Sequence, residues 1–148
     1  MSAVRFYLVR HGRAEAHRGG DDASRRLTAE GRDRFRAHAR ELAATLAVSR
    51  IATSPFARAR ETADLFAAAT GALVHEEAAL ASGVSSGREV LRLGRRLGPG
   101  AALVGHNPEL AEAVAIAAGK SVALEPGAVA AVEADASGFR LVWIRAPG

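Results

Sequence analysis

The sequence predicts an α/β fold, a three-layer sandwich with a mostly parallel central sheet, helices on both faces and a C-terminal antiparallel hairpin. Two observations support this prediction. Short apolar runs of strand length alternate with longer segments of helical periodicity, and Gly, Pro, Ser or Asn stands at the junctions between them. No linker, repeat or low-complexity block interrupts the pattern, so residues 1–148 are expected to form a single domain.

The first strand is expected at residues 4–9, where a nearly continuous apolar run is typical of a strand buried on both faces. Residues 13–26 are polar and rich in Gly, Asp and Arg, which predicts a mobile loop. Thr28 then predicts the N-cap of a helix through about Leu46, with apolar or small residues on one face.

A second strand is expected at residues 49–53. Ser54-Pro55 follows it, and serine at the cap with proline at the first helical position predicts a helix through about Thr70. A glycine ends that helix, and residues 72–75 predict a third strand.

The next helix is expected after a glycine-containing loop and ends at about Leu97. Residues 101–105 are an apolar fourth strand, and Asn107-Pro108 repeats the cap-plus-proline signal for a helix to about Ala118.

The last part of the chain predicts the hairpin, with strands at residues 128–133 and 139–144 on either side of Ser137-Gly138. It adds at least one antiparallel strand to the sheet. The strands before it alternate with helices, as in parallel sheets.

Composition limits the classes of function. Apolar residues make up 49% and charged residues 24%, which is ordinary for a soluble globular protein. The net charge of +4 comes almost wholly from arginine, with Lys120 the only lysine, and it is too small to indicate a nucleic-acid partner. The absence of cysteine excludes disulfides, a thiolate nucleophile and a cysteine metal site. With no signal-peptide layout and no apolar stretch of about 20 residues, we expect a cytoplasmic protein with no membrane contact, and a monomer.

The residues that carry chemistry lie at strand ends. Arg10 and His11 end the first strand, Arg58 lies in the first turn of the helix after the second, and His106 ends the fourth. Ligands of open parallel sheets bind outside the carboxyl ends of the strands, so these four side chains are expected to converge.

Arg58 also breaks a local rule, because a cation in the first turn of a helix faces the positive end of the helix dipole. A bound anion would reverse the sign of that effect. Two histidines could instead indicate a metal site, but arginines rather than carboxylates accompany both of them, which favours an oxyanion. No metal and no cofactor are therefore expected.

Taken together, these segments resemble the signature blocks of the histidine phosphatase superfamily. The resemblance lies in the following stretches: Val9-Arg10-His11-Gly12, Arg25-Arg26-Leu27-Thr28 with Gly31, Thr53-Ser54-Pro55 with Arg58-Ala59 and Thr62-Ala63, and Val104-Gly105-His106-Asn107. The short chain has little room for the lid-forming insertions of longer members. It looks most like the compact, SixA-like branch of phosphohistidine phosphatases.

The resemblance implies a mechanism. His11 would be the nucleophile that forms a covalent phosphohistidine, which water then hydrolyses. Arg10, Arg58 and His106 would bind and stabilise the phosphoryl oxygens without metal. Arg25 and the backbone N–H of Asn107 are further candidates for phosphate binding. The implied partner is a protein that carries phosphohistidine.

The general acid that many superfamily members place downstream of the second block is not evident, because Ala79 stands at the aligned position. Glu15, Glu76 and Glu77 are the candidates nearby, and a phosphoramidate leaving group has less need of an acid than an alkoxide. Two alternatives therefore stay open. The chain could be a phosphatase for small phosphoesters, or a non-catalytic module that binds phosphate and regulates a partner.

Overall fold

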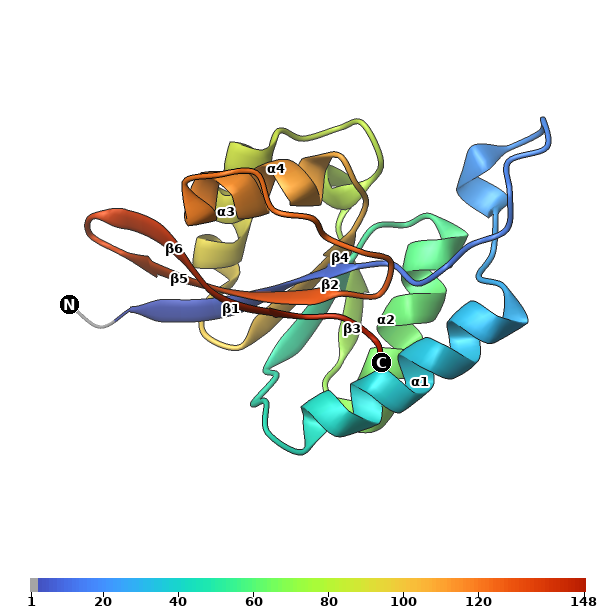
Figure 1. The fold of residues 1–148 in the computed structure, drawn as a ribbon, viewed down its shortest axis with the longest axis horizontal. Coiled ribbons are helices and arrows are strands. Elements are labelled where there is room, and N and C mark those ends of the chain that lie inside the picture. Colours follow the sequence, from blue (N-terminus) through green and yellow to red (C-terminus); the bar gives the residue numbers. More distant parts are fainter. Residues whose placement is uncertain (1–2) are drawn as a thin grey trace.

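Six strands form one sheet in the order β3-β2-β4-β1-β5-β6 in the computed structural model, which describes residues 3–148 (Figure 1). The strands are β1 (Val4–Arg10), β2 (Arg50–Thr53), β3 (Val74–Glu76), β4 (Ala101–Gly105), β5 (Val129–Asp135) and β6 (Gly138–Arg145). The helices are α1 (Ala29–Ala43), α2 (Ala57–Thr70), α3 (Gly87–Leu97) and α4 (Glu109–Ala118), with short 3-10 helices η1 (Asp22–Ser24) and η2 (Ala78–Leu80).

The strand directions agree with the predicted sheet. Strands β1 to β4 pair in parallel, β5 runs antiparallel to β1, and β6 runs antiparallel to β5. The mostly parallel sheet and the C-terminal hairpin are thus confirmed. Within residues 3–148 no helix combines the length and apolar character that crossing a membrane requires.

Helices cover both faces of the sheet, with α1 and α2 on one side and α3 and α4 on the other (Figure 1). Strand β1 shows why its sequence is nearly continuously apolar. Phe6 and Leu8 belong to the core on the α3–α4 side, whereas Tyr7 and Val9 belong to the core on the α1–α2 side. Successive side chains of a strand point to opposite faces, and here both faces are buried.

Two predicted helix starts are wrong by one or two residues. The helix after β2 begins at Ala57, and the Ser54 hydroxyl accepts from the backbone N–H of Phe56, 3.1 Å away, instead of capping the helix. The helix after β4 begins at Glu109, so Pro108 is the cap and not the first helical residue. In both places the chain makes an additional turn at the strand end, where the functional side chains lie.

Other boundaries shift slightly. Helix α1 ends at Ala43 rather than near Leu46, and the third strand occupies Val74–Glu76 rather than residues 72–75. The predicted cap at Thr28 is confirmed, because its hydroxyl accepts from the N–H of Gly31 at 2.9 Å.

Helix α3 packs closely on β1 because Gly94 has no side chain. A Cβ at Gly94 would overlap the ring of Phe6, which is fully buried. Close packing at this point fixes the distance between the helix and the strand that leads into the candidate site.

Candidate active site

The two central parallel strands bring His11 and His106 together. Arg10 of β1 pairs in register with Gly105 of β4, so each histidine follows its strand by one residue. The backbone N–H of His11 donates to the carbonyl of Gly105 at 3.1 Å, and the two imidazole centroids are 5.1 Å apart. The convergence expected at the carboxyl ends of the strands is present.

A cavity of about 380 Å³ opens at this edge of the sheet. Its lining includes all six predicted site residues: Arg10, His11, Arg25, Arg58, His106 and Asn107. Arg58 enters from the first turn of α2 and Arg25 from the loop that follows β1. Thr62 of α2 holds that loop in place, because its hydroxyl accepts from the N–H of Gly12 at 3.1 Å.

His11 is fixed in one tautomer when neutral. Its Nδ1 lies 2.7 Å from the carbonyl of Gly12, and a carbonyl only accepts, so Nδ1 carries the hydrogen and Nε2 carries the lone pair. Burial lowers the pKa of His11 to about 4. The hydrogen bond to Gly12 acts in the opposite direction, and the positive charges of the cavity arginines lower the pKa further. At neutral pH the ring is therefore uncharged and nucleophilic.

His106 is more deeply buried, with 3% of its surface exposed. Its Nε2 lies 2.8 Å from the hydroxyl of Ser54, and the ring of Phe56 packs edge-on against it. Burial, followed by the proximity of His11 and Arg58, lowers the pKa of His106 to about 3. Its Nδ1 is buried and has no hydrogen-bond partner within residues 3–148.

Arg10 and Asn107 are anchored by one carbonyl. Nη1 of Arg10 and Nδ2 of Asn107 donate to the backbone oxygen of Leu124 at 3.0 and 3.1 Å. Nε of Arg10 and Nε of Arg58 are buried, and neither has a hydrogen-bond partner in the described part of the chain. The guanidinium and imidazole groups around the cavity therefore have incomplete hydrogen bonding, which favours a site for an oxyanion.

None of the three glutamates considered as a general acid lines the cavity. Glu15 accepts from the N–H of Arg26 through one side-chain oxygen, and Glu76 pairs with Arg60 at 3.2 Å. Glu77 precedes η2 and is also absent from the lining.

The carboxylate that does line the cavity is Asp22, which the sequence reasoning missed. It lies in η1, and its side chain contacts both Arg25 and Arg58. Its position three residues before Arg25, inside an irregular loop, gave no periodic signal. Hydrogen bonds from Arg25 and then Arg58 hold the pKa of Asp22 below its usual range.

The described part of the chain, residues 3–148, contains no group of three His, Cys, Asp or Glu side chains arranged to hold a metal ion. The potential ligands at the cavity are two histidines and Asp22, and Asp22 is already paired with two cations.

Comparison with known proteins agrees with the resemblance to histidine phosphatases and with a cavity that suits an oxyanion. The sequence model of the histidine phosphatase superfamily (branch 1) matches residues 6–88, more than half of the chain. The chain belongs to this superfamily. The matched range contains His11, Arg25 and Arg58, whereas His106 lies beyond it and joins the site through the fold.

Solved structures of other proteins share the fold of this histidine phosphatase over nearly its whole length. A protein of Agrobacterium tumefaciens assigned as the phosphohistidine phosphatase SixA has 22% identity and a TM-score of 0.82, covering 99% of this chain and 100% of its own. The protein histidine phosphatase SixA complexed with tungstate has 22% identity and a TM-score of 0.83, with 97% of each chain covered.

A phosphoserine phosphatase of Entamoeba histolytica, in complex with 3-phosphoglyceric acid, has 14% identity and a TM-score of 0.74, with 96% of each chain covered. Among curated proteins, no sequence matches this chain. The chain is thus a histidine phosphatase superfamily phosphatase with a compact SixA-like fold, a fold that phosphatases for small phosphoesters share.

Proposed function

We propose that this protein is a metal-independent phosphatase that forms a covalent phosphohistidine on His11 and that its substrate is phosphohistidine on a partner protein. The observation that supports this most strongly is the state of His11. Its Nδ1–H is bound to the carbonyl of Gly12, its ring is neutral, and it shares the cavity with four arginines. An imidazole held this way is prepared to attack an electrophile that carries negative charge.

In the first step, the lone pair of His11 Nε2 attacks phosphorus. The bond from phosphorus to the leaving nitrogen breaks, and its electron pair stays with the departing imidazole, which leaves neutral because its other ring nitrogen already carries a proton. Arg10 and Arg58 stabilise the charge on the phosphoryl oxygens. Water then attacks the phosphorylated His11, the P–Nε2 bond breaks, and inorganic phosphate leaves.

His106 complements this arrangement as a donor. Ser54 accepts from Phe56, so its own hydroxyl hydrogen is available to Nε2 of His106. Nδ1 of the neutral ring is then an N–H donor without a partner among the residues that the structure describes. We assign that N–H to a phosphoryl oxygen.

The choice of substrate follows from the missing acid. Proton donation matters most for poor leaving groups such as alkoxides, and it contributes about 10²–10⁴-fold in rate. Glu15, Glu76 and Glu77 do not line the cavity, and Asp22 is kept ionised by two arginines. A phosphohistidine can carry a proton from solvent on its other ring nitrogen and then leaves as neutral imidazole, so it needs no acid from the enzyme and suits such a site better than an alkyl phosphate.

The test is a quenched-turnover experiment on a phosphohistidine protein, with an aryl phosphate and an alkyl phosphate beside it. We expect acid-labile phosphate on His11, feeble hydrolysis of the alkyl ester, and loss of turnover in His11→Ala. His75→Ala is the matched control, because His75 lies on β3 and outside the cavity. Full activity without a phosphorylated His11 would contradict covalent catalysis, and efficient turnover of alkyl phosphates would favour a small-phosphoester substrate.

Treatment with EDTA tests the metal-independent part of the proposal. Activity should be unchanged, because arginine and histidine side chains are assigned to the phosphoryl charge. Inhibition that added metal restores would contradict this assignment.

A further inference from the structure

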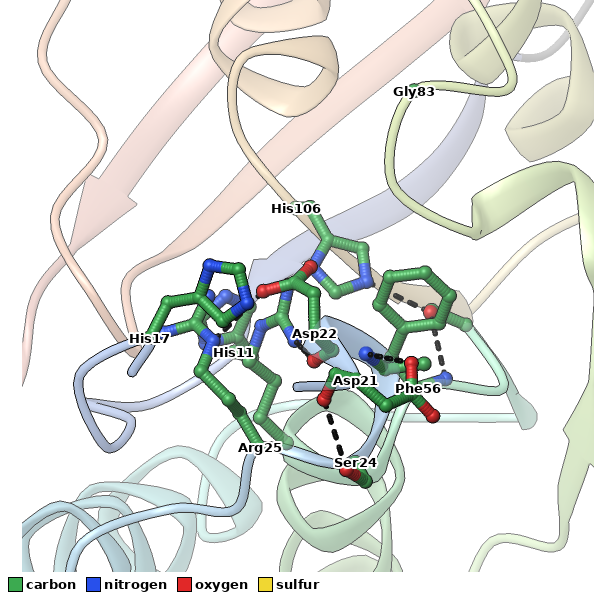
Figure 2. A network of polar contacts seen from close by, with 12 residues as sticks. His11, His17, Asp21, Asp22, Ser24, Arg25, Phe56, Gly83 and His106 are labelled. Atoms are coloured by element: carbon green, nitrogen blue, oxygen red, sulfur yellow. Dashed lines mark hydrogen bonds and ion pairs between the residues drawn. The ribbon is translucent and has the colours of Figure 1, made fainter. Parts of the chain in front are cut away.

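Asp22 forms hydrogen bonds with arginines that would bind the phosphoryl group in the proposed function. Its Oδ2 accepts from Nη2 of Arg58 at 3.1 Å, and its backbone oxygen accepts from Nη1 of the same guanidinium at 2.7 Å. Its Oδ1 accepts from Nε of Arg25 at 2.8 Å. Figure 2 shows the Asp22 side chain directed toward His11 and His106, inside the ring of cavity residues.

The contact leaves Arg58 almost without exposed surface. Arg58 is 3% exposed and its Nε is buried, so a phosphoryl oxygen has little access to this guanidinium in the described conformation. The Asp22 side chain is 41% exposed, and it lies on the three-residue helix η1 within an otherwise irregular loop. Of the two partners, Asp22 is therefore the one that can move away.

A carboxylate and a phosphoryl group make the same kind of contact with a guanidinium, since both offer two oxygens to its parallel N–H groups. Arg58 also lies in the first turn of α2, where its charge opposes the helix dipole. Asp22 supplies the anion that offsets this charge before any substrate arrives.

We propose that Asp22 is an internal occupant of the phosphoryl subsite and that its carboxylate exchanges with the phosphoryl group of the substrate. This inference rests on the proposed function, because it takes the same arginines as the phosphate ligands. Phosphate binds only to molecules in which Asp22 has withdrawn, so its apparent affinity is the intrinsic affinity multiplied by the fraction of such molecules. The returning carboxylate favours release of the product.

The experiment measures binding of inorganic phosphate by calorimetry, without turnover. Asp22→Asn keeps the shape of the side chain and removes its charge, so we expect phosphate to bind about tenfold more tightly or better. Asp21→Asn is the matched control, because it removes the same charge one residue away. Asp21 is exposed and caps η1 through the N–H of Ala23, with no contact to an arginine among its hydrogen bonds and ion pairs within residues 3–148.

Unchanged or weaker binding by Asp22→Asn would overturn the inference and show that Asp22 orients Arg58 for the ligand. Equal tightening in both variants would overturn it as well, because the effect would then be one of net charge. Asp22→Ala, whose folding is checked by circular dichroism, should also bind phosphate more tightly, which separates loss of the carboxylate from any effect of the asparagine side chain itself. Asp22→Asn could bind phosphate more tightly even though the protein never forms phosphorylated His11. That result would support the exchange and would contradict only the proposed catalysis.

Discussion

His11 and His106 are 5.1 Å apart between ring centroids, in a cavity that four arginines also line. Protonating either ring would add a further cation to a partly desolvated cluster. Burial first, and then the neighbouring positive charges, lower the pKa of His11 to about 4 and that of His106 to about 3. The arginines supply the positive charge, so the imidazoles are free to act as a nucleophile and a neutral donor.

A pH profile tests this division of roles. With neutral His11 as the proposed nucleophile, kcat/KM should stay high down to about pH 5 and fall only as the pH approaches about 4, the pKa of His11. An acid limb centred near 6.5, the ordinary histidine value, would contradict the assignment. Circular dichroism across the same range separates titration from acid unfolding.

Arg58 should contribute mainly in the transition state. Arg58→Ala is expected to lower kcat by about 10²–10³-fold, as the loss of one preorganised donor does, while the protein stays folded. Arg60→Ala is the control on the same helix, since Arg60 is half-exposed and pairs with Asp64 and Glu76 outside the cavity. A loss confined to KM would indicate that Arg58 binds ground state and transition state equally.

At the scale of elements, the sequence predicted strands and helices well because the spacing of apolar residues follows which side chains of each element are buried. The continuous apolar run of β1 and the Thr28 cap were read directly from residue types. Asp22 could not be predicted, because its role depends on how an aperiodic loop folds back onto α2. The start of α2 was missed for a related reason: Ser54 is used by His106 and by a tight turn, so it does not cap the helix.

The contact between α3 and β1 gives a test of packing. Gly94→Ala places a methyl group against the fully buried ring of Phe6 and should lower the free energy of unfolding by about 1–3 kcal/mol. Arg92→Ala, on the exposed face of the same helix, should change it by less than about 0.5 kcal/mol. Urea unfolding of the two variants checks the difference, and equal stabilities would mean that α3 can move away from the sheet at little cost.

At the scale of the whole molecule, stability should depend on pH through the histidines. Burial lowers the pKa of His38 as well as those of His11 and His106, so the folded protein takes up these protons less readily than the unfolded chain. Between the ordinary value of about 6.5 and the lowered values, the unfolded state binds more protons, and stability therefore falls as the pH decreases.

The free energy of unfolding should thus be near its plateau above about pH 6.5 and decline from there toward pH 4. Urea titrations at several pH values measure the slope. Replacing His106 with Asn should reduce that slope, because one depressed titration is removed. A stability that stays flat from pH 7 to 5 would show that the buried rings gain their protons without cost.

The order of strands in the sheet also has a consequence for how the chain folds. Strand β1 comes first in the sequence, yet its two neighbours are β4 and β5, which begin at Ala101 and Val129. As the chain leaves the ribosome, β1 has both edges unpaired until most of the protein has been synthesised. Contacts between such distant segments slow folding, and an apolar strand with open edges is prone to associate with other chains. The central position that brings His11 beside His106 therefore leaves the first strand without its partners in the sheet until the last third of the chain has been synthesised.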